Sequence, residues 1–205
     1  MNTRIDTLES SGISQSQQRF FPWVIVALSS MFLFYKYVMQ ISPSIMTQQL
    51  MQAFHINGAG LGNLAATFFY SYLITQLFVG VLLDKLGPRF LSSAAILVSA
   101  LGTYFFAIAD SLTTACLART LMGVGAAFAT VSYMKLAANW FEANKFAFIG
   151  GLLATAAMIG AIFGQAPLAW LVGETGWRHS LILCAWVGIA TAILFLAIIR
   201  DNPKP

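Results

Sequence analysis

Residues 80–89 read Gly-Val-Leu-Leu-Asp-Lys-Leu-Gly-Pro-Arg, and they join two long apolar stretches of the chain. One carboxylate, two cations and a Gly-Pro turn are therefore packed into a short link between two segments long enough to cross a membrane. A carboxylate at the carboxyl end of a helix is unfavourable for the helix dipole. We therefore expect Asp84 to be compensated by Lys85, by Arg89 or by the amino-terminal end of another helix.

The composition of the whole chain agrees with a membrane protein. The 205 residues are 59% hydrophobic and only 9% charged, with a mean hydropathy of +0.77, whereas soluble domains carry roughly 25% charged residues. The net charge of +4 is not gathered into a long basic run, which argues against nucleic-acid binding. Residues 1–19 are polar, and we interpret them as a disordered cytoplasmic tail.

Six apolar stretches are each long enough for a transmembrane helix, which needs about 20 residues. They lie near residues 21–43, 61–83, 90–109, 112–137, 146–171 and 180–199. These stretches predict an all-α polytopic membrane protein, with a bundle over residues 20–200 and the start of a cytoplasmic loop at 201–205. Lys and Arg are concentrated in alternate links, which places both termini in the cytoplasm. A bacterial inner membrane is the location we expect.

An internal echo indicates a duplicated unit. The second span ends in Asp84, Gly87 and Arg89, and the fifth ends in Glu174, Gly176 and Arg178. By the predicted topology the two ends face opposite sides of the membrane. Two three-helix units related by inversion produce this arrangement.

Together these residues resemble the amino-terminal half of a major facilitator superfamily transporter. The match rests on residues 80–89, on Arg119-x-x-x-Gly123-x-Gly125 and on the Gly-Trp-Arg of residues 176–178, and it covers roughly residues 20–203. The resemblance implies half of a twelve-helix fold and secondary active transport of a small molecule by rocker-switch alternating access. The sequence has neither a Gly-x-x-x-x-Gly-Lys-Ser/Thr phosphate loop nor a His-Glu-x-x-His metal motif, so we expect no cofactor, no metal and no catalytic residue. A proton or a sodium ion is the candidate coupling ion, and membrane lipid surrounds the bundle.

Two departures from the family pattern qualify that expectation. Residues 160–167 do not carry the Gly-Pro-x-x-Gly-Gly pattern of many proton antiporters, which favours uptake and therefore symport over drug export. The chain also has six spans where family members usually have twelve. Transport would then need a second six-helix half or a homodimer, whether the chain is truncated or naturally split.

Two cations lie inside predicted spans without an acid well placed to neutralise them. Lys36 is near the middle of the first span and Arg119 is in the fourth. Two unpaired cations near one cavity would attract an anion, so we expect an organic anion as substrate. For Arg119 a second interpretation stays open, namely a buried structural arginine bound to carbonyl groups, because an intramembrane charge must find partners.

The sequence thus predicts two sets of functional residues. In the gating set we expect Gly80 to allow close helix approach and Gly87 to form the turn with Pro88; by the resemblance, Asp84 latches the two halves of the transporter. The predicted substrate-binding residues are Lys36, Gln40, Tyr70, Arg119, Tyr133 and Gln165. The predicted gating residues are Gly80, Asp84, Lys85, Gly87 and Arg89.

Two other classes of function compete with transport. One is a non-transporting six-helix scaffold or regulatory partner in the membrane. The other is a membrane enzyme, which would need acids, histidines or cysteines gathered at one depth. The seven acids stand mostly in links and tails, so we predict that the protein is not an enzyme.

Overall fold

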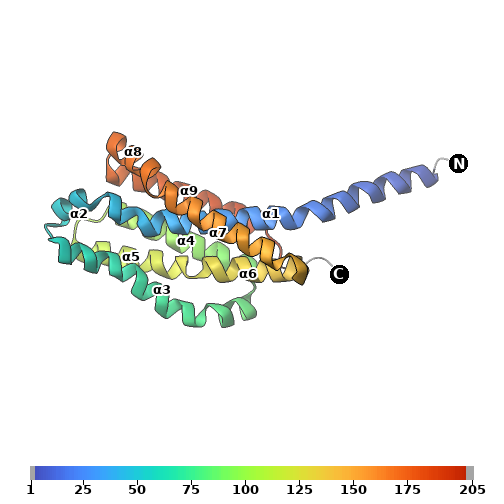
Figure 1. Ribbon diagram of the computed structural model, residues 1–205, viewed down its shortest axis with the longest axis horizontal. Helices are drawn as coiled ribbons and strands as arrows, with labels where there is room; N and C mark the ends of the chain where they lie inside the picture. Colours follow the sequence, from blue (N-terminus) through green and yellow to red (C-terminus); the bar gives the residue numbers. More distant parts are fainter. Residues whose placement is uncertain (1–2, 202–205) are drawn as a thin grey trace.

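The computed structural model describes the backbone of residues 3–201 and the side chains of residues 20–201, and within that range the chain is helical apart from short connections (Figure 1). The elements are α1 (Thr3–Ile45), α2 (Thr47–Phe54), α3 (Gly58–Leu86), α4 (Pro88–Ala107), α5 (Leu112–Ala126), α6 (Phe128–Trp140), the 3₁₀ turn η1 (Ala143–Lys145), α7 (Phe146–Phe163), α8 (Ala166–Thr175) and α9 (Trp177–Ile198).

Six helical segments are long and apolar enough to cross a membrane, as predicted. The fourth consists of α5 and α6, which meet at Ala127, and the fifth consists of η1, α7 and α8. The chain is therefore an integral, multi-pass membrane protein. The segments run over Phe20–Ile45, Gly58–Leu86, Pro88–Ala107, Leu112–Trp140, Ala143–Thr175 and Trp177–Ile198.

The long helices lie side by side, and both chain termini are at the same end of the bundle (Figure 1). The short helices α2 and α8 are at the opposite end. The amino-terminal part of α1 projects beyond the bundle, so the backbone of residues 3–19 is helical where the sequence suggested a disordered tail. The domain boundaries near 19 and 200 stay predictions.

Local sequence explains where three of the helices begin. Asn57 caps α3 by accepting a hydrogen bond from the Gly60 amide at 2.9 Å. Ser111 and Thr114 form a reciprocal capping box at the start of α5, which satisfies amides that have no intrahelical partner. Pro88 occupies the first turn of α4, where its missing N–H costs nothing.

The interior consists of two hydrophobic clusters arranged along the bundle. One lies toward α2 and contains Phe54, Phe106 and Trp177. The other lies toward the chain termini and contains Leu83 and Phe195. The side chain of Tyr72 is packed against both clusters, so the region around it lies between the two apolar layers.

Candidate substrate site and gate

The Arg-x-x-x-Gly-x-Gly sequence of α5 touches three neighbouring helices. A methyl group added at Gly123 would lie 2.3 Å from the Phe68 carbonyl oxygen of α3. One added at Gly125 would lie 2.3 Å from the Ala95 carbonyl oxygen of α4. Both distances are far inside van der Waals contact, so only glycine allows α5 to pack this closely between α3 and α4.

Arg119, one turn before Gly123, connects α5 to α1. Its side chain is fully buried, and its Nη1 donates a hydrogen bond of 3.1 Å to the Met39 carbonyl oxygen. Pro43 stands four residues after Met39 and has no N–H, so this carbonyl cannot make its usual helical hydrogen bond. The Ser42 hydroxyl donates to the same oxygen at 2.9 Å. Arg119 therefore supplies a donor at the place where proline interrupts α1.

The rest of the Arg119 guanidinium is enclosed by aromatic rings. Its Cζ atom lies 4.8 Å from the Phe68 ring centroid and 6.0 Å from that of Phe106. Among the described residues, its Nε and Nη2 have no hydrogen-bond partner. This geometry matches the structural interpretation of Arg119, since the side chain binds a carbonyl group and does not reach the surface of the bundle.

Lys36 has different surroundings, although it is also buried, with 5% of its surface exposed. Its Nζ lies 3.7 Å from the Tyr37 ring centroid and 5.1 Å from that of Tyr72 in α3. Within residues 20–201 the ammonium group makes no hydrogen bond or ion pair. It is a cation in the region between the two hydrophobic clusters, and two tyrosine rings lie close to it.

The two cations, Lys36 of α1 and Arg119 of α5, both contact rings on α3. The Phe68 ring, which contacts Arg119, is stacked on the Tyr72 ring at a centroid distance of 6.2 Å and an interplanar angle of 14°. Tyr72 in turn contacts Lys36. The structure thus brings Lys36 and Arg119 into one aromatic cluster.

The other four residues of the predicted substrate-binding set do not join this cluster. Tyr133 is buried, and its hydroxyl donates to the Ile149 carbonyl oxygen at 3.0 Å, linking α6 to α7. Gln40 is half-buried in α1. Tyr70 is 65% exposed on α3, and Gln165 is exposed at the break between α7 and α8. Their roles in substrate binding stay predictions.

Two of the expected partners of Asp84, Lys85 and Arg89, are wrong. Its carboxylate forms an ion pair with Lys135 of α6, and neither Lys85 nor Arg89 is its partner in the structure. Lys85 is exposed at the end of α3, while the Nε of Arg89 donates to the Leu196 carbonyl oxygen of α9 at 3.0 Å. Asp84 and Lys135 are 51 residues apart in sequence, so only the packing of α3 beside α6 brings them together.

The two glycines of the predicted gate differ. A methyl group at Gly80 would meet no atom within 4 Å in the described part of the chain, so no helix of this bundle approaches it closely and its predicted role stays a prediction. The reason is that this side of α3 is exposed. Gly87 does form the turn, with φ 78° and ψ 146°, a conformation that side chains other than glycine rarely adopt.

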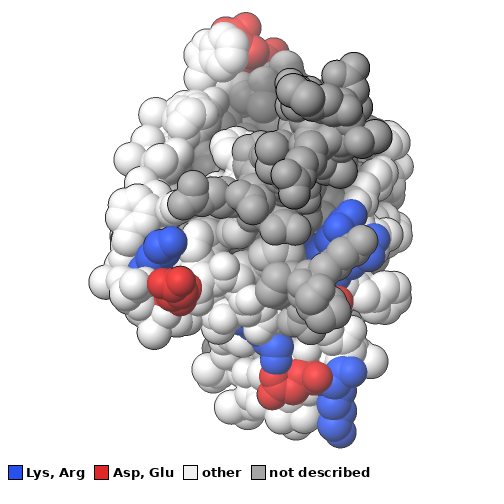
Figure 2. Space-filling view, turned by 90° about the vertical axis from the view of Figure 1, so that its right-hand side faces the viewer, with Lys and Arg blue, Asp and Glu red and all other residues white. Residues whose placement is uncertain are grey.

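The end of the bundle that carries both termini has Lys and Arg side chains beside Asp and Glu side chains around its rim (Figure 2). Asp84, Lys135 and Arg89 belong to this end of the fold. Within residues 20–201, no group of three His, Cys, Asp or Glu side chains is arranged to hold a metal ion.

Sequence reasoning missed the importance of Tyr72, Pro43 and Lys135. A proline four residues after a span carbonyl is a local signal, and it could have indicated that the Met39 carbonyl needs a donor from another helix. The positions of Tyr72 and Lys135 have no such local signal, since each depends on which helix lies beside it.

Comparison with known proteins supports the fold and the family. The profile described as Major Facilitator Superfamily matches residues 23–205. An uncharacterized transporter, YybO, of Bacillus subtilis is 25% identical over 84% of this chain and 40% of its own length. The chloroplastic ascorbate transporter of Arabidopsis thaliana is 23% identical over 89% of this chain and 34% of its own length.

Solved structures agree with this result. A bacterial homologue of the human lysosomal transporter Spinster, in an inward-facing and occupied conformation, superposes with a TM-score of 0.81 at 15% identity. It covers 90% of this chain, and this chain covers 46% of it. The chain therefore spans less than half the length of these relatives. The relatives' names point to a transporter and not to an enzyme, and the matching profile shows that the chain belongs to the Major Facilitator Superfamily.

Proposed function

We propose that this bundle is one half of a secondary active transporter that moves a small organic anion by rocker-switch alternating access. The observation that carries the proposal is Lys36, a buried cation whose neighbours are the rings of Tyr37 and Tyr72. The acids of the described residues stand near helix ends or in links. Burying a cation without a partner costs free energy, and a carboxylate or a phosphate ester at Lys36 would remove that cost.

The name of one relative supports an anionic substrate. The Arabidopsis relative is named as an ascorbate transporter, and ascorbate carries a negative charge at neutral pH. Lys36 would attract such a charge, while the rings of Tyr37 and Tyr72 would exclude water and strengthen the attraction. Arg119 would act indirectly, by holding α1 in the shape that presents Lys36.

The second half, or a second copy of the chain, would pack against α3 and the α7–α8 segment. These two spans are the least buried, at 22% each, compared with 50–56% for the first, third and fourth spans. Tyr70 lies on one of them and Gln165 on the other, and both are exposed. Their predicted contact with substrate would therefore occur where the two halves meet.

The gate would be the end of the bundle that carries both termini, which the distribution of Lys and Arg assigns to the cytoplasm. There the Asp84–Lys135 ion pair ties α3 to α6. A second half that closes on this end would compete with Lys135 for the Asp84 carboxylate. Exchanging the charges, Asp84→Lys with Lys135→Asp, should restore most of the transport that either single change removes; failure of the exchange would exclude this pair from the gate.

Anion binding is tested with the purified chain in detergent. A ligand that binds only the folded state raises the unfolding temperature. Ascorbate, glucuronate and glucose 6-phosphate are compared with neutral glucose, for the wild type, for Lys36→Gln and for Lys145→Gln. Lys145 is an exposed cation in a link, which makes it the matched control.

We expect at least one anion, and not glucose, to stabilise the wild type and Lys145→Gln, and Lys36→Gln to lose the effect. Equal stabilisation of Lys36→Gln would remove Lys36 from the site. Stabilisation by glucose alone would overturn the anionic substrate.

Transport is then measured as counterflow of the radiolabelled anion into liposomes that contain the chain, with and without an imposed proton or sodium gradient. Accumulation driven by one gradient identifies the coupling ion. Entry of the anion in the same direction as that ion indicates symport. Movement of an anion by the chain alone would require a homodimer. If the wild type binds none of the anions, the anion-transport proposal fails and the scaffold or regulatory function takes its place.

A further inference from the structure

Two corners of the bundle, at opposite ends, have the same backbone shape. Gly87 precedes α4 with φ 78° and ψ 146°, and Gly176 precedes α9 with φ 80° and ψ 156°. Each glycine is followed by one ring-bearing residue and then by an arginine, Arg89 in α4 and Arg178 in α9. The sequence echo between the two spans is therefore a conformational repeat.

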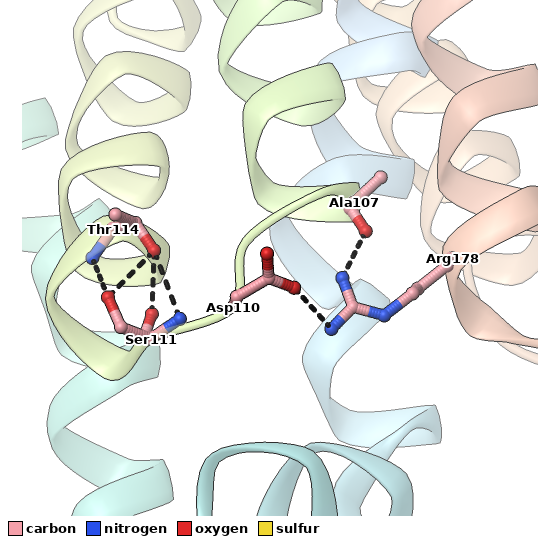
Figure 3. A network of polar contacts seen from close by, with 5 residues as sticks. All are labelled: Ala107, Asp110, Ser111, Thr114 and Arg178. Carbon is pink, nitrogen blue, oxygen red and sulfur yellow. Dashed lines mark hydrogen bonds and ion pairs between the residues drawn. The ribbon is translucent and has the colours of Figure 1, made fainter.

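Each arginine reaches across to the carboxyl end of the other helix. The Nε of Arg89 donates to the Leu196 carbonyl oxygen of α9 at 3.0 Å. The Nη1 of Arg178 donates to the Ala107 carbonyl oxygen of α4 at 2.7 Å (Figure 3). Ala107 lies as many residues after Arg89 as Leu196 lies after Arg178, so the two contacts are equivalent under the internal repeat.

An acid completes each corner. Asp201 follows the end of α9, and its Oδ1 accepts a hydrogen bond of 2.6 Å from the Arg89 amide at the start of α4. Asp110 follows the end of α4, and its Oδ1 lies 3.7 Å from the Arg178 Nη2 (Figure 3). Both acids are the third residue after the last residue of their helix. The acids that the structure uses are thus not the Asp84 and Glu174 of the sequence echo.

The electrostatics of both corners are favourable. The last carbonyl groups of a helix have no partner within the helix, and a cation there interacts well with the helix dipole. The Asp201 carboxylate lies at the start of α4, where a negative charge is favoured and where Gly87 has no side chain to act as a cap. Between the corners the helices are close, since a methyl group at Gly188 of α9 would lie 2.8 Å from the Ala100 Cβ of α4.

We propose that Arg89 and Arg178 are reciprocal clamps, related by the internal repeat, which join α4 and α9 at both membrane faces into one rigid pair. This inference is independent of the proposed substrate. It assigns a role to Arg178, and it gives Arg89 a positioning role within one bundle in place of a gating role between two. The remaining helices would move against the second half while α4 and α9 keep their mutual position.

Hydrogen exchange of backbone amides, measured by mass spectrometry on the chain in lipid nanodiscs, tests the clamps. Removing a clamp should loosen the carboxyl end of the partner helix, which is far from the substituted residue in sequence. We expect Arg178→Gln to accelerate exchange at least tenfold in the last turn of α4, residues 104–108. Arg89→Gln should do the same in the last turn of α9, residues 194–198.

Controls and conservative variants keep the test specific. Glu174→Gln and Lys145→Gln change exposed charges near each end, and they should leave both regions unchanged. Arg178→Lys and Arg89→Lys retain one donor and the charge, so they should preserve much of the protection and serve if a glutamine variant does not fold. Faster exchange confined to the substituted residue's own helix, or no change in the partner helix, would overturn the proposal.

Discussion

Lys36 and Arg119 are both buried cations that contact rings of α3, yet their surroundings are opposite in kind. Arg119 donates to a helix carbonyl that Pro43 leaves without its usual partner, and its side chain is fully enclosed. Lys36 has the rings of Tyr37 and Tyr72 beside its ammonium group, which makes no hydrogen bond or ion pair among the described residues. The comparison separates two kinds of buried charge. Arg119 binds a backbone carbonyl group and so joins two helices, whereas Lys36 has no such partner among the described residues, and we assign it to ligand binding. The other polar groups around each cation distinguish the two cases.

The largest effect is expected from Arg119→Ala. The substitution leaves a void between Phe68 and Phe106 and removes a donor from the Met39 carbonyl. Losing the hydrogen bond from a charged donor costs about 1.5–3 kcal/mol, and the cavity adds to that cost. Removing Nε and Nη2, which have no partner among the described residues, offsets only part of it, so the unfolding temperature in detergent should fall clearly. An unfolding temperature equal to that of the wild type would show that Arg119 is not structural and would break the comparison.

The next largest effects are expected from substitutions of the aromatic residues around the two cations. They should distinguish the role of Arg119 from that of Lys36. Phe68→Leu removes a buried ring from Arg119, and we expect a loss of about 1–2 kcal/mol of stability, because packing and a cation–π contact are both lost. Tyr37→Leu removes the ring nearest to Lys36, and it should weaken the stabilisation by bound anion more than it weakens the bundle itself. Both quantities come from thermal unfolding with and without the anion. The reverse ranking would contradict the two roles.

A smaller effect is expected for the coupling free energy between Arg119 and Pro43. Pro43→Ala restores a backbone N–H that can bond the Met39 carbonyl, so the carbonyl no longer depends on Arg119. In a double-mutant cycle, Arg119→Ala should therefore cost about 1 kcal/mol less in the Pro43→Ala background than in the wild type. Strict additivity of the two changes would mean that the arginine does not compensate for the proline.

The smallest change in stability is expected from Lys36→Ala. The void that the substitution creates is unfavourable, but an unpaired buried cation is removed, and its cost on insertion scales is at least about 2.5 kcal/mol. The two effects should nearly cancel, leaving the unfolding temperature close to that of the wild type while anion binding is lost. A fall as large as that of Arg119→Ala would make Lys36 a structural residue too.

The sequence was informative about elements and less so about contacts. All six spans lie within a few residues of their predicted ranges, and the Gly87–Pro88 turn has the expected shape. The sequence also indicated that Lys36 and Arg119 are cations inside apolar spans, and the structure buries both side chains. Lys85 and Arg89 were wrong as partners of Asp84, since Lys85 is exposed and Arg89 bonds to the Leu196 carbonyl oxygen of α9.

Sequence by itself determined the membrane-spanning architecture, because the thickness of the hydrocarbon layer and the need to satisfy every backbone polar group within one helix are local constraints. Only the tertiary structure decided which charged groups meet. The contacts of Asp84 with Lys135, of Arg178 with the Ala107 carbonyl and of Arg119 with the Met39 carbonyl join residues 51, 71 and 80 positions apart. Such pairs depend on how the helices pack against one another, where small residues such as Gly123, Gly125 and Gly188 set the distance between neighbours.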